Sequence, residues 1–411
     1  MILSIFGFKK PIAEDWNFTR LNPYRARQAG AKSSPAKNHI SRTHPAVVKT
    51  YGDLLWMDPG EPTAVERTLA VVRDVVQRYD VDGIHVDDYF YPYPIPVPGA
   101  PRPPDLLQPG TSPPPVPEVE FPDDPSWQRY LTAGGTLSRP AWRRQQVVLE
   151  MGKTVKQIKP WVRFGVSPFG IGRPELRPAG IEGFSQYDKL YADVERWWEE
   201  GWVDYLAPQL YWPIEQKPQA FGVLLKYWAE NNRSKRHLWP GLYTSRINAT
   251  DKSWNPTEIE QQIALIRSNS GASGHIHFSM VALAQNRRGV SDQLARSTYS
   301  SPALVPATPW LERDRPSEPR MKVTPQTSSS GATPAIEVRF LESTGKKPAL
   351  YSVWSRRGKV WQLSVVPASN PSLTLSNMPS PSSEGINRIV VTAIDRVGNE
   401  SPRTTLSLPS K

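Results

Sequence analysis

The sequence predicts an α/β fold, a (β/α)8 barrel of TIM type, followed by a small all-β sandwich. Short apolar strands alternate with amphipathic helices over residues 52–279, which is the pattern of repeated parallel βαβ units. Proline-rich residues 302–316 end this pattern, and short strands separated by Gly, Asn and Ser turns follow. The predicted domains are therefore a barrel over residues 1–300, a linker over 301–317 and a sandwich over 318–411.

The predicted elements follow this order along the chain. Helices are predicted over residues 62–79, 142–158, 187–200, 218–231 and 256–268, where apolar side chains recur at helical spacing. A strand is predicted over 52–57, and residues 92–125 form a long loop because of their many prolines. Sandwich strands are predicted over 335–340, 349–356, 360–365, 372–375 and 387–395. Six barrel strands are predicted to end near Asn22, Asp87, Ser167, Tyr211, Thr244 and Ser279.

Composition excludes several classes of protein. The 411 residues contain no cysteine, which removes disulfides, thiolate metal sites and cysteine nucleophiles. No apolar run approaches 18 residues, so no transmembrane segment is predicted. The net charge of +11 is scattered, which favours a solvated basic surface over nucleic-acid binding. The apolar residues 1–6 are too short for a signal peptide, and none is visible. We expect a monomer.

Asp87 is the first candidate catalytic residue. Side chains alternate along a strand, so Ile84 and Val86 face the helices, while His85 and Asp87 point inward. Asp87 then lies at the mouth of the barrel, where a carboxylate can attack or stabilise an oxocarbenium-like centre. The structural alternative is an ion pair with an inward Arg or Lys. Asp88 is the second candidate, able to orient Asp87, act as the acid or bind a sugar hydroxyl.

A second carboxyl for glycoside chemistry is not evident at the ends of the next two strands. The possible second carboxyls lie on loops or helices: Asp58, Asp193, Glu175, Glu215 and Asp123–Asp124.

Aromatic residues gather after the predicted strands, where rings can stack on the apolar faces of sugars and polar neighbours can bind hydroxyls. For a single Tyr, core packing is the favoured alternative. The predicted substrate-binding residues are Asn22, Tyr24, Arg25, Asp58, His85, Tyr89, Tyr91, Phe169, Gln209, Tyr211 and Trp212. No cofactor motif is present, and no metal site is predicted because His275 and His277 lack a carboxylate nearby in the sequence.

Six segments together carry a family resemblance: NPYRAR, LWMDPGEP, VDGIHVDDYFYPYP, WRRQQV, FGVSPFGIGR and VDYLAPQLYW. They resemble the glycosyl-hydrolase-like ten family of bacterial TIM-barrel glycosidases, some of which act on peptidoglycan glycan strands. The resemblance covers residues 20–300 and implies hydrolysis of O-glycosidic bonds in a cell-wall or amino-sugar polysaccharide, outside the cell or in the periplasm. The segment TAIDRVGNESP resembles the end of a fibronectin type III domain.

The chain also departs from this family. Two strand–helix units that precede NPYRAR in the family are absent, so we expect the chain to start late within the barrel. Ala141 and Gln146 replace an Asp and an Asn, and Gly172 and Pro174 stand where the family has Trp and Asn. These departures favour an alternative function, a non-catalytic carbohydrate-binding or scaffold protein.

The segment DGIHVDDY also partly resembles the Asp-rich strand of chitinase-like enzymes, in which the acetamido group of the substrate attacks the anomeric carbon. In this chain Tyr89 occupies the place of the acidic Glu of that motif, and His85 replaces an Asp.

Overall fold

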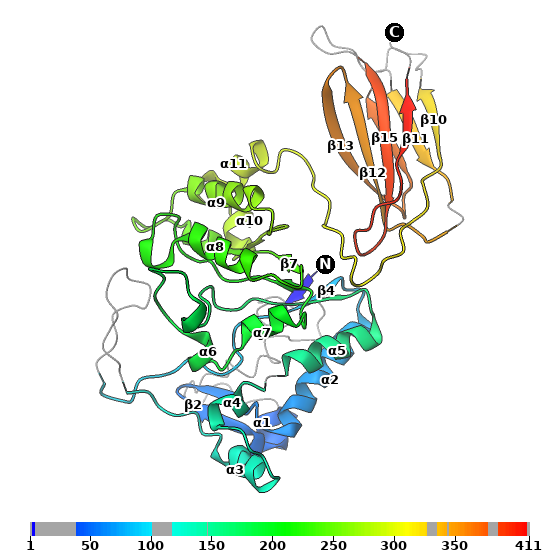
Figure 1. The fold of residues 1–411 in the computed structure, drawn as a ribbon. Helices are drawn as coiled ribbons and strands as arrows, with labels where there is room; N and C mark the ends of the chain where they lie inside the picture. Colours follow the sequence, from blue (N-terminus) through cyan, green and yellow to red (C-terminus); the bar gives the residue numbers. More distant parts are fainter. Residues whose placement is uncertain are drawn as a thin grey trace. The chain divides into compact units, whose positions relative to one another are not determined.

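The computed structural model describes residues 2–4, 38–100, 117–145, 147–326, 335–342, 345–376 and 385–408. The chain divides into two compact units, Met1–Val290 and Ser291–Lys411 (Figure 1). The domain boundary predicted after residue 300 therefore falls inside the second unit.

Parallel strands form the centre of the first unit. Five of them pair side by side in chain order: β1 (Ile2–Ser4), β4 (Gly83–Val86), β5 (Arg163–Val166), β6 (Tyr205–Leu206) and β7 (His237–Leu238). Just after β7, β8 (Gly241–Leu242) pairs in parallel with β9 (Ile276–His277). A bridge between Gln209 and Gly241 links β8 to the strand path of β6. Such consecutive parallel pairing is typical of (β/α)8 barrels. The strand predicted to end near Asn22 lies outside the described residues.

Helices connect these strands. A longer helix precedes or follows most strands, and shorter helices lie in the connecting loops. They are α1 (Ile40–Thr43), α2 (Pro62–Arg78), α3 (Asp124–Thr132), α4 (Arg139–Arg143), α5 (Val148–Ile158), α6 (Gln186–Lys189), α7 (Val194–Glu199), α8 (Phe221–Glu230), α9 (Pro256–Ser268), α10 (Met280–Ala284) and α11 (Val290–Arg296). Helices α2 and α5 lie side by side (Figure 1).

The first unit is held together by apolar faces that the sequence pattern predicts. Helix α2 begins at Pro62, which suits a first helical position because proline lacks the N–H that would be unsatisfied there. It buries Val72, Val75 and Val76 on one side. Alternate strand residues such as Ile84 and Val86 are buried as well. The helix-facing side chains of β4 are therefore those expected from their alternation.

Several elements differ from the prediction. The helix predicted over 142–158 is two helices, α4 and α5, and the one predicted over 187–200 divides into α6 and α7, between which Tyr191 adopts a positive φ of 52°. The predicted strand 52–57 is the second half of an antiparallel hairpin, β2 (Val48–Tyr51) with β3 (Leu54–Met57). Its turn contains Gly52 at φ +59°, a backbone conformation that favours glycine.

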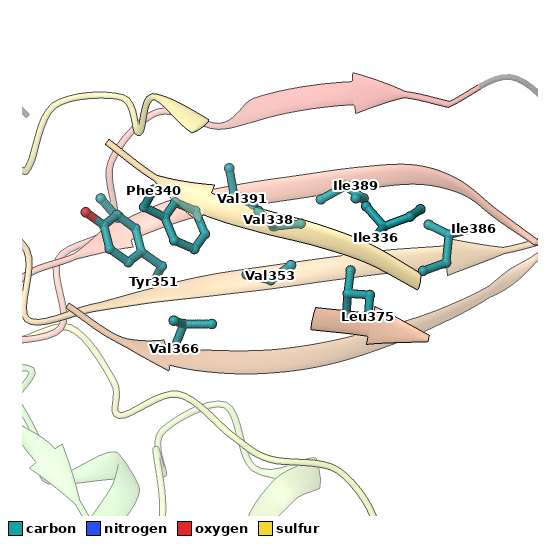
Figure 2. Packing of buried hydrophobic residues seen from close by; sticks show 11 residues of the cluster. Ile336, Val338, Phe340, Tyr351, Val353, Val366, Leu375, Ile386, Ile389 and Val391 are labelled. Atoms are coloured by element: carbon teal, nitrogen blue, oxygen red, sulfur yellow. The ribbon is translucent and has the colours of Figure 1, made fainter. Parts of the chain in front are cut away.

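The second unit is a β-sandwich of two antiparallel sheets, ordered β10-β11-β14 and β13-β12-β15-β16. Rings of Phe340 and Tyr351 stack across the two sheets with centroids 3.9 Å apart, and Val338 and Val391 are buried between them (Figure 2). Strands β10 and β16 were not predicted. The strands are β10 (Met321–Gln326), β11 (Ala335–Phe340), β12 (Leu350–Arg357), β13 (Val360–Pro367), β14 (Ser372–Ser376), β15 (Ile386–Ile394) and β16 (Thr404–Ser407).

Among the described residues, no helix is both long enough and apolar enough to span a bilayer.

Candidate active site

Asp87 lies directly after β4, at the carboxyl end of the parallel strands. Its Oδ1 accepts a hydrogen bond of 2.9 Å from the side-chain amide of Gln209. The same amide donates to the carbonyl oxygen of Ser167, at 3.2 Å, just after β5. Gln209 itself follows β6. The side chain of Gln209 therefore connects the ends of β4, β5 and β6 by hydrogen bonds. Two residues predicted for the site, Asp87 and Gln209, are in direct contact.

Asp88 lies beside Asp87 and is more deeply buried, with 4% of its surface exposed. Its Oδ2 accepts a hydrogen bond from the hydroxyl of Tyr93, and its backbone N–H donates to Oδ1 of Asp87 at 3.1 Å. Among the described residues, no cation forms an ion pair with either carboxylate. The described residues therefore do not form the structural alternative for Asp87, an ion pair with an inward Arg or Lys.

The two carboxyl groups perturb one another. Burial, followed by the negative charge of Asp88, raises the pKa of Asp87 to about 7. Burial also raises the pKa of Asp88, against the hydrogen bond from Tyr93, which stabilises the ionised form. Two adjacent, poorly solvated carboxyl groups do not both ionise readily. The pair therefore holds a proton up to a pH of about 7, the raised pKa of Asp87.

Aromatic rings surround this pair. Tyr89 is 40% exposed and contacts the ring of Tyr93, with centroids 5.8 Å apart. Tyr211 stacks on Phe278 at 5.3 Å, and the nearby charges of Asp87 and Asp88 add to burial in raising the pKa of Tyr211 well above its ordinary value. Tyr211 therefore lies near the acid pair, and Tyr89 lies against Tyr93, which donates a hydrogen bond to Asp88.

Phe169 and Trp212 form a second aromatic contact, with centroids 5.6 Å apart. Phe169 follows β5 and is partly exposed, whereas Trp212 is only 5% exposed. The burial of Trp212 argues against the direct substrate contact predicted for it, and Trp212 instead supports the ring of Phe169.

His85 faces the inside of the sheet and takes part in its packing. Its Nδ1 lies 2.9 Å from the hydroxyl of Tyr205, and the two rings are stacked with centroids 5.7 Å apart. Gly165 makes room for this arrangement, because a Cβ there would overlap the Tyr205 ring. Burial lowers the pKa of His85 to about 4, so the imidazole is neutral at physiological pH. These contacts favour a packing role over the substrate contact predicted for His85.

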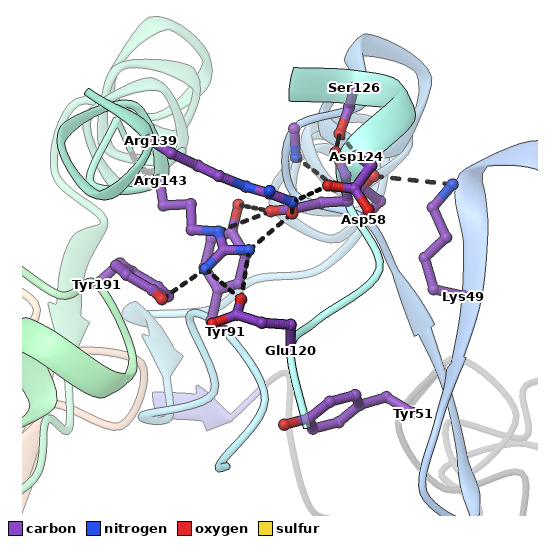
Figure 3. A network of polar contacts seen from close by, with 12 residues as sticks. Lys49, Tyr51, Asp58, Tyr91, Glu120, Asp124, Ser126, Arg139, Arg143 and Tyr191 are labelled. Atoms are coloured by element: carbon purple, nitrogen blue, oxygen red, sulfur yellow. Dashed lines mark hydrogen bonds and ion pairs between the residues drawn. The ribbon is translucent and has the colours of Figure 1, made fainter. Parts of the chain in front are cut away.

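Tyr91 belongs to a separate polar network around Arg143 (Figure 3). Its hydroxyl lies 3.4 Å from Oδ2 of Asp123, and Arg143 donates two hydrogen bonds to the same carboxylate at 2.8 and 2.7 Å. Burial alone would raise the pKa of Asp123, but hydrogen bonds from Arg143 and Arg139 hold it below its ordinary value. Tyr91 is 2% exposed, which argues against the substrate contact predicted for it.

Asp58 is also buried in this region (Figure 3). Its carboxylate accepts hydrogen bonds from Ser126 at 2.8 Å and from the backbone of Gly60 at 2.9 Å, and Lys49 lies 3.9 Å away. Burial raises the pKa of Asp58. Because it is fully enclosed, Asp58 stabilises the loop after the β2–β3 hairpin, and the predicted sugar contact is not supported.

The other possible second carboxyls are also engaged or exposed elsewhere. Arg173 pairs with Glu175 at 3.4 Å and with Asp193 at 3.6 Å. Glu215 is exposed. Asp124 forms an ion pair with Arg139 at 2.8 Å.

Sequence reasoning did not single out the buried carboxyl of Glu195 on α7. Its Oε1 accepts hydrogen bonds from the backbone of Arg173 and the hydroxyl of Tyr227, both at 2.8 Å, and burial raises its pKa. The Tyr227 hydroxyl occupies the space that a Cβ at Gly172 would need. A tyrosine from α8 therefore fills the space beside Gly172, a long-range contact that no local sequence signal reveals.

No group of three His, Asp or Glu side chains that could hold a metal ion occurs within the described residues. His275 and His277 have ring centroids 5.2 Å apart, and Nδ1 of His277 lies 2.6 Å from Oγ1 of Thr244. Four other residues from the sequence analysis, Asn22, Tyr24, Arg25 and Gln146, lie outside the described part of the chain.

The fold and the site together define an α/β protein with an acid pair and aromatic rings at the carboxyl end of a parallel sheet, where such proteins bind ligands. The chain belongs to the Glycosyl hydrolase-like 10 family, whose model matches residues 23–256. The family recognised from the six sequence segments is therefore confirmed.

Two relatives illustrate the family. Glycosyl hydrolase YngK of Bacillus subtilis is 33% identical over 395 residues, which are 92% of this chain and 72% of YngK. Glycosyl hydrolase DigH of Escherichia coli K12 is 31% identical over 280 residues, 62% of this chain and 58% of DigH. A solved structure of Bacteroides uniformis beta-glucuronidase 2 matches over 85% of this chain and 37% of the glucuronidase chain, with 10% sequence identity and a TM-score of 0.34.

Proposed function

We propose that this protein is a glycoside hydrolase that cleaves O-glycosidic bonds in a cell-wall or other amino-sugar polysaccharide, such as peptidoglycan glycan strands. The observation that carries the proposal is the Asp87–Asp88 pair, in which burial and mutual repulsion raise the pKa of Asp87 to about 7. A protonated carboxyl at neutral pH is what glycoside cleavage needs to protonate a leaving oxygen. Family membership supports the same class of reaction.

In this proposal Asp87 is the general acid. It is the more accessible member of the pair, and its raised pKa suits a proton donor better than the nucleophile that the sequence also allowed. Asp87 gives its proton to the glycosidic oxygen as the bond to the anomeric carbon breaks, and a water molecule then adds to that carbon and returns a proton to Asp87. Asp88 acts through Asp87: its carboxylate, stabilised by the hydroxyl of Tyr93, keeps the proton on its neighbour. Gln209 fixes the orientation of the Asp87 carboxyl.

The aromatic rings give the proposed substrate its place. Tyr89, Phe169 and Tyr211 are at least partly exposed beside or near the acid pair, and they present faces on which pyranose rings stack. An amino-sugar polymer fits this environment because its apolar ring faces can stack on the aromatic rings while its polar substituents bind the hydrogen-bonding groups beside them.

Three further features belong to the same proposal. The parallel sheet forms the wall of a TIM-type barrel, the sandwich is a fibronectin type III-like accessory domain, and the protein works as a monomer outside the cell or in the periplasm.

Release of reducing ends from purified peptidoglycan glycan strands tests the proposal. We expect product from the wild-type chain and release at least about 100-fold slower from Asp87→Asn, while Asp251→Asn, which alters an exposed carboxyl, keeps wild-type activity. Binding of the glycan without any product from the wild-type chain would instead support the alternative, a carbohydrate-binding protein without turnover. Full activity of Asp87→Asn would refute the assignment of the acid.

A further inference from the structure

The outer face of the sandwich sheet that contains β12 and β13 carries two exposed tryptophans. Trp354 on β12 pairs in register with Leu363 on β13, and Trp361 lies two residues before Leu363. Val353, which precedes Trp354 on β12, and Val366, five residues after Trp361 on β13, point into the sandwich core (Figure 2). Since side chains alternate along a strand, Trp354 and Trp361 share the opposite, outward face.

This face is apolar and yet accessible. The exposed fractions of Trp354 and Trp361 are 38% and 41%, and that of Val365, on the same face of β13, is 36%. Leu363 is the register partner of Trp354 and lies two residues after Trp361 on the same strand, and it is only 7% exposed. Diagonal neighbours on adjacent strands stand about 7–8 Å apart, so the two indoles can contact adjacent rings of one extended ligand.

Two arginines border the tryptophans. Arg356 pairs in register with Trp361 on one side and with Arg388 of β15 on the other. The Cζ atom of Arg356 lies 5.5 Å from the centre of the Trp361 ring, and its Nε donates to Oδ1 of Asn387 at 2.9 Å. Within the described residues, no carboxylate forms an ion pair with Arg356 or Arg388. Like charges directly opposite on adjacent strands are destabilising, and a bound anion would relieve that repulsion.

We propose that this face, formed by Trp354, Trp361, Arg356 and Arg388, is a binding surface for an acidic polysaccharide. Pyranose rings stack on the two indoles, and carboxylates of the polymer pair with the two arginines. The surface lies in a different compact unit from Asp87, and its ligand binding does not depend on hydrolysis.

A second copy of the chain is the competing occupant, because β13 is an edge strand. Two features of the strand oppose edge-to-edge pairing. Lys359 immediately precedes β13 and Pro367 ends it, and a flanking lysine and a terminal proline both protect edges against pairing. Arg356 and Arg388, which stand opposite each other on adjacent strands, likewise favour an anionic ligand over a second, equally basic copy of the chain.

Affinity electrophoresis of the full chain tests the proposal with two soluble polymers that share one backbone, carboxymethylcellulose and hydroxyethylcellulose. Neither contains amino sugars, so neither is the substrate proposed for the Asp87 site. We expect stronger binding to carboxymethylcellulose, and a loss of about tenfold in affinity for Trp354→Ala or Trp361→Ala. Both substitutions preserve charge, so this loss separates stacking from general attraction between a basic protein and a polyanion.

Matched variants complete the experiment. Trp161→Ala removes a tryptophan of equal exposure, 38%, from the first unit, and we expect it to bind as the wild type does. Trp361→Phe retains a stacking ring and should lose less affinity than Trp361→Ala. Arg356→Gln should weaken binding to carboxymethylcellulose alone.

Three results would overturn the proposal. The first is wild-type affinity in both tryptophan-to-alanine variants. The second is equal binding of the two polymers. The third is a change in sedimentation coefficient on substitution, since that would assign the face to self-association.

Discussion

Substitution of Asp88 by asparagine gives the sharpest test of the acid pair, because it removes the charge beside Asp87 and leaves the proposed acid in place. The pKa of Asp87 lies at about 7, against an ordinary value of 3.8, a difference of about three pH units. That difference corresponds to about 4 kcal/mol in favour of the protonated form. Burial is its largest cause and the Asp88 charge the second.

Asp88→Asn removes the Asp88 charge and the carboxyl hydrogen bond that also raises the pKa of Asp87, but it leaves the burial, so we expect the pKa of Asp87 to fall by roughly one unit while remaining above 3.8. Since the proposed acid must be protonated, activity declines on the alkaline side with a midpoint near 7 in the wild type. A fall of one unit lowers the protonated fraction at pH 7 from about one half to about one tenth, and the rate about fivefold.

The assay is the pH dependence of kcat/KM for reducing-end release from soluble glycan oligosaccharides, which reports the pKa values of the free enzyme. Asp251→Asn serves as the control for a lost carboxyl that is exposed. An alkaline midpoint in Asp88→Asn that coincides with the wild-type midpoint would refute the reasoning, as would a midpoint that moves to higher pH.

Three further predictions concern stability. Asp87→Asn should raise the free energy of unfolding at pH 7 but not below pH 4. The reason is that a carboxyl whose folded pKa is raised destabilises the fold progressively as pH rises from 3.8 to about 7. Equal effects of the substitution on thermal unfolding at both pH values would contradict this. Gly165→Ala should destabilise by about 1–3 kcal/mol in denaturant titrations, through overlap with a buried ring, whereas Gly222→Ala, which meets no atom within 4 Å, should not destabilise. Arg143→Ala should cost about 3–5 kcal/mol, because it removes two charge-assisted hydrogen bonds to the buried carboxylate of Asp123 and leaves Arg139 as its remaining ion-pair partner among the described residues. Lys226→Ala, at an exposed pair, should change stability by less than about 0.5 kcal/mol. Similar losses in Arg143→Ala and Lys226→Ala would refute the argument.

Local patterns were sufficient for much of the fold. Helix α9 occupies the residues at which apolar spacing predicts it, and β11 matches its predicted range. The inward position of Asp87 also follows from the alternation within one strand. These features depend on residues close together in the sequence, so a single chain contains the information needed to predict them.

Non-local pairing accounts for what the sequence did not reveal. Asp58 and Asp87 both follow short apolar strands, yet β3 pairs antiparallel with a neighbouring strand, whereas β4 pairs in parallel with distant ones. Their different surroundings follow from those partners. Arg143 and Asp123 likewise form their buried pair across 20 residues, and the sequence shows only that each is charged.

The leaving-group dependence of Asp87→Asn tests most directly whether Asp87 is the proton donor. A dinitrophenyl glycoside needs no protonation to leave, whereas a natural O-glycoside does. We predict that Asp87→Asn loses about 100- to 10,000-fold in kcat/KM on the natural glycoside and far less on the dinitrophenyl glycoside of the same sugar. An equal loss on both substrates would contradict a role in protonating the leaving oxygen.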